Sequence, residues 1–322
     1  MAKDRHDVFD VAVIGGGPAG LSAGVALARA LRSVVVIDAG EQRNLGAESV
    51  HGFLSREGMS PRDLIAAGRD ELARYGGTIT SGYVSSANRR GDDGFVLALA
   101  DGSTVSVRRL LIATGIVDEL PDLPGVADRW GRDVLYCPYC HGWEIRNRKI
   151  GVLAADGHSV LQALTFRQWS PDVTLLLNDA LELSSGQAEQ LAARSVQVVE
   201  GKVRALAVRD DRLVGATLAS GPTVGLDVLV VSPATMSKAN MLQRLGLEPA
   251  ALEEGPGTRL ETDQTGRTSC SGVWAAGNAT DVSAQVMTAA AAGLRAAEAI
   301  NADLVLADTR KAVEEARVPA GQ

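Results

Sequence analysis

A short apolar strand followed at once by a run of glycines constrains the fold of this chain more than any other feature. Residues 10–14 form the strand, and Gly15, Gly17 and Gly20 open an alanine-rich helix that we expect to reach about residue 31. Glycines in this order permit a tight turn, the close approach of a pyrophosphate and close packing of the helix on a sheet. The pattern indicates a nucleotide-binding turn.

A second strand at residues 34–37 ends at Asp38, at the distance where a carboxylate binds the ribose of an adenosine. The first helical turn, with Pro18 and Ala19, would offer free backbone amides and the positive end of the helix dipole to phosphates. Strand, glycine turn, helix, strand and acid together predict a Rossmann-like unit at the start of the chain.

The rest of the chain also alternates between strands and helices, so we predict an α/β protein. A second strand-turn-helix-strand unit occupies residues 149–177, after a proline-rich crossover at 118–124. We expect helices at residues 61–75 and 283–307, and a charged tail at 308–322 that frays. Further strands are expected at residues 78–88, 94–100, 104–107, 109–112, 195–199, 203–208, 226–231 and 260–268.

Two of the three cysteines, Cys137 and Cys140, are separated by two residues and followed by His141. This spacing suits a redox-active disulfide, a metal clip or the attachment of a c-type haem. A zinc site needs a second pair of ligands, and Cys270 stands alone. Haem attachment belongs to exported proteins, and a glutaredoxin-type domain would not follow a nucleotide-binding unit. We therefore expect a redox-active pair, with Cys270 as a buried filler.

Composition argues against several kinds of partner. A net charge of −7 and a pI near 5.2 give no basic footprint, so we expect no nucleic-acid partner. The longest apolar runs, such as residues 34–37 and 228–231, are too short to span a membrane. With few cysteines and no apolar leader segment, we expect a cytoplasmic protein.

The glycine turn, a small-residue turn at residues 113–115, the cysteine pair and the segment 276–278 before a long helix resemble the low-molecular-weight thioredoxin reductases. The resemblance covers nearly the whole chain. It implies a homodimer in which each protomer has two Rossmann-like, three-layer ββα domains. The FAD domain is discontinuous, residues 1–118 and 241–322, and the inserted NAD(P)-type domain, residues 119–240, carries the cysteines. The positions that the resemblance assigns to FAD binding are Gly15, Gly17, Pro18, Ala19, Gly20, Asp38, Ala113, Thr114, Gly115, Gly277, Asn278, Gln285 and Val286.

Three departures from that family bear on function. Asn278 stands where the reductases have an aspartate, which removes one negative charge from the FAD site. In the inserted domain, Asp156 and Ser159 occupy the turn that should cradle the NADPH pyrophosphate, and a carboxylate there repels phosphate. Residues 177–179, Leu-Asn-Asp, replace the basic cluster for the 2′-phosphate. We predict that the NADPH site is lost.

The run Cys-Pro-Tyr-Cys-His-Gly, residues 137–142, resembles the dithiol oxidases that close disulfides in gliotoxin-type and holomycin-type natural products. The resemblance implies that a small-molecule dithiol reduces the Cys137–Cys140 disulfide, and that electrons then pass through FAD to O2, giving H2O2. His141 is the nearest base for the thiol protons.

Two other functions remain open: a thioredoxin reductase that uses NADPH or another donor, and a non-enzymatic redox sensor. Some side chains also have alternative roles. His51, in the loop at residues 41–60, faces a flavin or substrate, or lies on the surface. Glu144 orients His141 or is simply solvated, and Trp143 is expected to pack.

Overall fold

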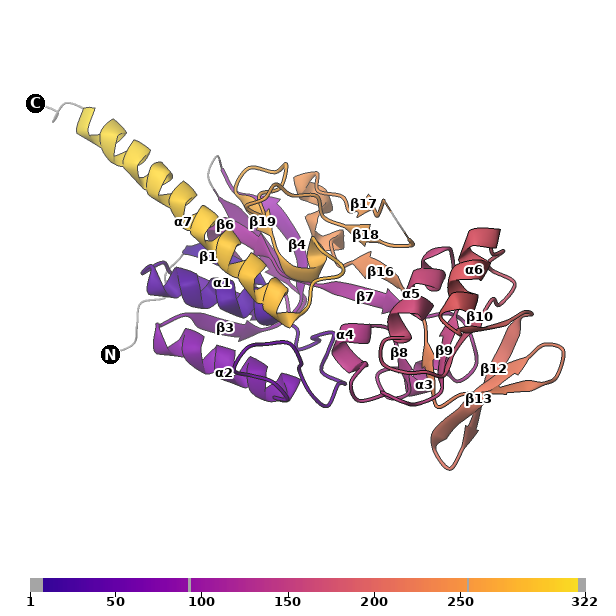
Figure 1. Ribbon diagram of the computed structural model, residues 1–322. Coiled ribbons are helices and arrows are strands. Elements are labelled where there is room, and N and C mark those ends of the chain that lie inside the picture. Colours follow the sequence, from indigo (N-terminus) through magenta and orange to yellow (C-terminus); the bar gives the residue numbers. More distant parts are fainter. Residues whose placement is uncertain (1–7, 92–93, 254, 318–322) are drawn as a thin grey trace, which may run out of the picture. The chain divides into compact units, whose positions relative to one another are not determined.

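The computed structural model describes residues 8–91, 94–253 and 255–317 (Figure 1). The chain forms two compact units. The first comprises Met1–Val117, Met236–Leu252 and Gly257–Gln322, and the second comprises Asp118–Thr235 and Glu253–Pro256. The second unit is thus an insertion within the first.

A seven-stranded sheet is the centre of the first unit. Its spatial order is β3 (Thr78–Ser81), β2 (Val34–Asp38), β1 (Phe9–Ile14), β6 (Thr104–Ile112), β5 (Phe95–Leu99) and β4 (Val84–Arg89), and β19 (Val273–Ala275) also pairs with β6. Strands β3, β2, β1, β6 and β19 run parallel, and β5 and β4 form an antiparallel extension. Parallel strands are covered on both faces, which explains why β1 and β2 are almost continuously apolar.

The two faces of this sheet pack against different elements. Val11 and Val13 lie in a core cluster with residues of α1 (Pro18–Arg29), α2 (Pro61–Arg74) and α7 (Val286–Arg317). Ala12 and Ile14 point to the opposite face, where β4, β5 and the 3-10 helix η1 (Asn240–Leu245) complete a second cluster. Helices α1 and α7 approach so closely that a Cβ on Gly293 would overlap the carbonyl oxygen of Ala19.

The second unit has three layers, as predicted. Its parallel sheet has the order β11 (Gln197–Val199), β10 (Val173–Leu176), β9 (Ile150–Leu153), β15 (Val228–Val230) and β8 (Val134–Leu135). Helices α5 (His158–Phe166) and α6 (Ser185–Ala193) pack on one face through Phe166 and Leu191. The antiparallel strands β12 (Val203–Arg209), β13 (Arg212–Leu218) and β14 (Thr223–Gly225) pack on the other through Leu213 and Leu218. The α/β fold class is confirmed.

The remaining elements are short. They are β7 (Ile116–Glu119), which pairs with β16 (Ala234–Ser237), then α3 (Val126–Arg129), α4 (Pro138–His141), β17 (Ala250–Ala251), β18 (Thr258–Arg259) and the 3-10 helix η2 (Gly277–Ala279).

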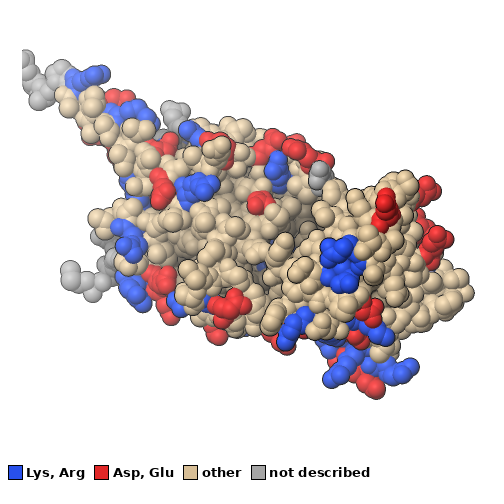
Figure 2. Space-filling view, viewed as in Figure 1, with Lys and Arg blue, Asp and Glu red and all other residues tan. Residues whose placement is uncertain are grey.

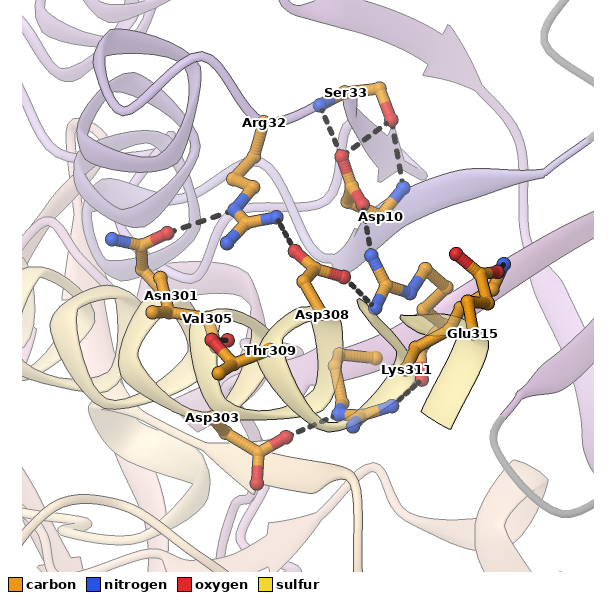
Figure 3. Close-up of polar contacts among 12 residues, drawn as sticks. Asp10, Arg32, Ser33, Asn301, Asp303, Val305, Asp308, Thr309, Lys311 and Glu315 are labelled. Carbon is orange, nitrogen blue, oxygen red and sulfur yellow. Dashed lines mark hydrogen bonds and ion pairs between the residues drawn. The ribbon is translucent and has the colours of Figure 1, made fainter. Parts of the chain in front are cut away.

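Residues 308–317 of the charged tail do not fray as predicted, since α7 continues as a helix to Arg317, and residues 318–322 lie outside the described residues. Figure 3 shows Asp308 on this helix reaching a cluster of polar side chains at the start of the sheet. Its carboxylate accepts a hydrogen bond from Arg32 at 2.8 Å and from Arg108 at 2.5 Å, and Arg108 also donates to Asp10 at 2.9 Å. These bonds fix the helix beyond the predicted end, and Lys311 and Glu315 add an i,i+4 pair.

Other element predictions were also wrong or incomplete. The strand expected at residues 78–88 is two strands, β3 and β4. Residues 104–107 and 109–112 are one strand, β6, rather than two. Residues 260–268 form turns instead of a strand, because the Asp263 side chain accepts hydrogen bonds from the amides of Thr265 and Arg267. Helix α6 was missed, although Ser184 and Gln187 form a capping box at its start.

Within the described residues, no helix is long and apolar enough to cross a membrane. On the face shown in Figure 2, acidic and basic side chains are interspersed, so neither charge covers a continuous area.

Candidate active site

Cys137 and Cys140 form a disulfide in the second unit, with their Cα atoms 5.3 Å apart. Helix α4 begins directly after Cys137, and the Cys137 sulfur accepts a hydrogen bond from the backbone N–H of Cys140 at 3.2 Å. Both cysteines are partly accessible, whereas Cys270 is buried, as expected of a filler residue. An accessible disulfide can accept two electrons or exchange with an incoming thiolate.

Two exposed aromatic side chains lie within three residues of this disulfide in the sequence. Tyr139, between the two cysteines, is 69% exposed and meets the ring of Trp169 edge-on at 5.7 Å between centroids. Trp143 is 66% exposed, so the prediction that it packs is wrong; the guanidinium of Arg146 lies 4.2 Å from its ring centroid instead. Exposed aromatic rings next to a disulfide offer apolar contact area to an incoming molecule.

His141 is the last residue of α4 and directly follows Cys140. Its backbone carbonyl accepts hydrogen bonds from the amides of Glu144 at 3.1 Å and Ile145 at 3.2 Å, which continue the turn. The imidazole is partly exposed. Backbone geometry thus fixes His141 next to the disulfide.

The glycine turn of the first unit has the close approaches expected from its sequence. Gly15 has a φ of 111°, and a Cβ there would overlap the carbonyl oxygen of Ala113. A Cβ on Gly20 would overlap the carbonyl oxygen of Gly15. Gly17, by contrast, faces open space: the nearest atom to a Cβ there is in the Gln42 side chain, at 3.9 Å.

The start of α1 is free to bind an anion. Gly17 is its N-cap and provides no side-chain hydrogen bond, and Pro18 occupies the first turn. Thr114, in the turn that follows β6, has a buried hydroxyl with no hydrogen-bond partner among the described residues. An open helix start beside an unsatisfied buried hydroxyl fits a bound phosphate-containing group.

Asp38 is 5% exposed and is held by several donors. Its carboxylate accepts hydrogen bonds from the Gly16 amide at 3.1 Å, the Gln42 side chain at 2.9 Å and Arg69 at 2.5 Å. The Arg69 contact could not be predicted from the sequence, because Arg69 lies 31 positions away on α2.

The remaining predicted FAD positions lie beside the same helix start. A Cβ on Gly277 would be 2.9 Å from the Cβ of Ala19, and Val286 is the first residue of α7. The Asn278 side-chain amide donates to the carbonyl oxygens of Asp281, Val282 and Ala284 at 3.0–3.2 Å. A carboxylate cannot donate these bonds, so Asn278 is used here as a donor and not as a weaker aspartate.

Comparison with known proteins identifies the family. The family described as Pyridine nucleotide-disulphide oxidoreductase matches residues 9–293. The chain belongs to this family.

This pyridine nucleotide-disulphide oxidoreductase is similar to Thioredoxin reductase sirT of Leptosphaeria maculans, with 31% identity over 94% of this chain and 96% of that protein. It is also similar to Thioredoxin reductase tcpT of Claviceps purpurea, with 30% identity over 84% and 87% of the two chains. Among solved structures, HlmI has 42% identity and a TM-score of 0.91 over 98% of both chains. These relatives support a thioredoxin reductase-like flavoprotein.

In the second unit of this oxidoreductase, side chains of the turn after β9 bind backbone amides of the same turn. The Asp156 carboxylate accepts a hydrogen bond from the backbone N–H of His158 at 2.9 Å, and the Ser159 hydroxyl accepts one from Ala155 at 3.1 Å. After β10, Asn178 and Asp179 both have left-handed backbone conformations, and the Asn178 side chain accepts from the Val203 amide. Side chains after β9 and β10 therefore accept hydrogen bonds from the backbone amides of Ala155, His158 and Val203.

His51 is paired in the first unit. Its Nδ1 lies 2.6 Å from Oε1 of Glu57, and the Gly52 amide donates to the other carboxylate oxygen at 2.9 Å. The His51 hydrogen bond, followed by that from Gly52, lowers the pKa of Glu57. No feature of the sequence predicted this pair.

Proposed function

We propose that this protein is an FAD-dependent dithiol oxidase that closes an intramolecular disulfide in a small molecule and reduces O2 to H2O2. The supporting observation is the turn after β9, where Asp156 and Ser159 side chains bind the backbone amides of His158 and Ala155. A turn that does not bind NADPH favours a thiol substrate as the source of the electrons that reduce the Cys137–Cys140 disulfide.

The first unit is assigned to FAD. The Gly15–Gly20 turn, the start of α1 and Thr114 would hold the phosphates, and Asp38 would face the ribose. Bound FAD supplies a two-electron acceptor that can be reoxidised by O2. Asn278, Gln285 and Val286 complete the assigned site beside the start of α7.

In the proposed reaction, a substrate thiolate attacks Cys137, the Cys137–Cys140 bond breaks, and a mixed disulfide forms. The second substrate thiolate then attacks the substrate sulfur of that bond, which closes the product disulfide and leaves two protein thiols. The dithiol has lost two electrons and two protons. His141 accepts a proton from the incoming thiol, because only the thiolate is a nucleophile.

The substrate assignment rests on the residues around the disulfide. The exposed rings of Tyr139 and Trp143 give a small, flat molecule more contact area than the disulfide alone would offer. A thioredoxin reductase function is favoured by the names of the relatives, and it differs from a dithiol oxidase in its electron donor. A redox sensor differs from a dithiol oxidase because it stops after one turnover.

Oxygen uptake tests the proposal. With dithiothreitol as substrate, the yellow holoenzyme should consume O2 over many turnovers and release one H2O2 per disulfide formed. Cys137→Ser should abolish uptake, and Cys270→Ala, which removes a thiol elsewhere, should not. Anaerobic NADPH should leave the flavin absorbance near 450 nm unbleached; rapid bleaching would instead establish a reductase, and uptake limited to one equivalent would establish a sensor.

A further inference from the structure

Helix α2 contributes an arginine to the site assigned to the cofactor. Arg69 Nη2 donates a hydrogen bond to Oδ2 of Asp38 at 2.5 Å, from 31 positions further along the chain. Asp38 is the last residue of β2, and its side chain is 5% exposed, whereas that of Arg69 is 39% exposed. Water screens a buried carboxylate only weakly, so its charge acts strongly on neighbouring groups. The partner of this carboxylate therefore influences whatever binds beside it.

The Asp38 carboxylate lies directly against the glycine turn of the first unit. The Gly16 amide donates to Oδ1 at 3.1 Å, and a Cβ on Gly16 would lie 2.5 Å from Oδ2. Gly16 lies between Gly15 and Gly17, in the turn that we assign to the phosphates. A diphosphate bound there would be repelled by the negative charge of Asp38. A positive charge paired with Asp38 reduces this repulsion.

The donors to Asp38 are two backbone amides and two side chains. Oδ1 accepts from the amides of Gly16 and Gly40, and the Gln42 side chain donates to both oxygens, at 3.0 and 2.9 Å. The Arg69 contact is the shortest of the set and carries the charge. A charge-assisted hydrogen bond is roughly twice as strong as a neutral one. Arg69 therefore does most to orient the carboxylate oxygen with which it pairs.

The ion pair with Asp38 does not satisfy the whole guanidinium group. Arg69 Nε is buried and has no hydrogen-bond partner within the described residues, a property that it shares with the Thr114 hydroxyl. A buried donor without a partner lowers stability, and the loss is larger for a charged group. A bound polar ligand can supply the missing acceptor. The arrangement is thus less favourable for stability alone than for binding.

We propose that Arg69 is a positioning residue of the cofactor site, which orients and neutralises Asp38 for the adenosine ribose of FAD. This inference rests on the part of the proposed function that assigns FAD to the first unit. Arg69 holds the carboxylate that accepts a hydrogen bond from the ribose, and its charge offsets that of Asp38 beside the diphosphate. Its effect is therefore confined to the adenosine diphosphate half of the cofactor.

The test measures FAD affinity and needs neither a dithiol nor O2. Holoenzyme is equilibrated at several concentrations in an ultrafiltration cell, and the flavin in the filtrate gives the dissociation constant. Arg69→Met removes the charge and the donors, and it should bind FAD at least about tenfold more weakly than the wild type. Arg74→Met is the matched control, because Arg74 is exposed on the same helix. It should bind FAD as the wild type does.

An FAD analogue built on 2′-deoxyadenosine distinguishes positioning from a role in folding. In the wild type, loss of the ribose hydroxyl should weaken binding about tenfold. In Arg69→Met the same loss should weaken binding only about twofold, because Asp38 is no longer held in place. Arg69→Lys keeps the charge but lacks the planar fork, and it should lie between the two in both measurements.

The inference would be overturned if Arg69→Met bound FAD as tightly as the wild type, or if Arg74→Met lost as much affinity. An equal cost of the missing hydroxyl in the wild type and in Arg69→Met would also overturn it. If Arg69→Met does not fold, the same comparisons are made with Arg69→Lys. A wild type that passes these tests but takes up no O2 with dithiols would refute the proposed oxidase and leave this inference standing.

Discussion

The backbone of Gly142 lies against the indole ring of Trp169. A Cβ at position 142 would be 2.7 Å from two ring carbons and 2.5 Å from the carbonyl oxygen of Pro138. The residue after His141 must therefore be glycine for α4 to end where it does. This contact links the redox pair to the aromatic cluster through the backbone.

Gly142→Ala should shift the end of α4 and with it His141 and the disulfide. We expect dithiol turnover to fall at least tenfold while flavin content stays the same, and stability to fall by about 1–3 kcal/mol. Gly157→Ala is the matched control in the same unit, since nothing lies within 4 Å of a Cβ there. Oxygen uptake measures the turnover of the two variants, and urea unfolding measures their stability. Equal effects of the two substitutions would contradict the packing argument.

Substitutions of Asp156 test whether its side chain prevents the turn after β9 from binding NADPH. Asp156→Asn removes the charge but keeps an acceptor for the His158 amide, whereas Asp156→Ala frees that amide. Both should bind NADPH more tightly than the wild type, and Asp156→Ala more tightly than Asp156→Asn. Quenching of tryptophan fluorescence gives the affinities. Tight NADPH binding by the wild type itself would show that the turn still functions.

Asn278→Asp should destabilise the turn before α7. The aspartate cannot donate to the carbonyls of Asp281, Val282 and Ala284 and would bring like charge against them. We expect a loss of about 1–3 kcal/mol and weaker flavin retention. Asn301→Asp is the control, because Asn301 accepts a hydrogen bond from Arg32 and an aspartate can do the same. Thermal unfolding should separate the two variants.

The Arg32–Asp308–Arg108 contacts predict a pH-dependent effect on stability. The hydrogen bond from Arg32, with that from Arg108, lowers the pKa of Asp308 against the opposing effect of partial burial. Because the folded-state pKa lies below the unfolded value of roughly 3.9, the stabilisation is complete above that value and is lost as the pH falls through the folded-state pKa.

Asp308→Asn should therefore lower stability at pH 7, and this deficit should shrink as the pH falls below the unfolded value of roughly 3.9. Asp308 is 44% exposed, so solvent screening limits the loss to about 1 kcal/mol. Urea midpoints at several pH values measure it. A deficit that stayed constant with pH would mean that the carboxylate charge is not responsible.

Local chemistry explains which features could be read from the sequence. Gly15 was predictable because its backbone has a φ of 111°, Gly20 because a Cβ there would overlap the carbonyl oxygen of Gly15, and the Cys137–Cys140 pair because its spacing closes a small ring. The capping box of Ser184 and Gln187 was also present in the sequence and was overlooked. In each case the determining contacts lie within a few residues.

Long-range partners could not be read in this way. Arg69 reaches Asp38 at the end of β2 from helix α2, and the helical tail is held by Arg32 and Arg108, 276 and 200 positions from Asp308. The His51–Glu57 pair is local, but the approach of its loop to Gln285 is determined only by the fold.

The pairing of β19 with β6 has a consequence for synthesis. Residues 273–275 complete a sheet whose neighbouring strand ends at residue 112, so the nascent first unit lacks a strand and helix α7 until the whole inserted unit has left the ribosome. The inserted unit is almost entirely continuous and can fold while translation proceeds. Flavin capture must then be a late event, and a chain that stalls after residue 235 should emerge with its cysteine pair folded but colourless.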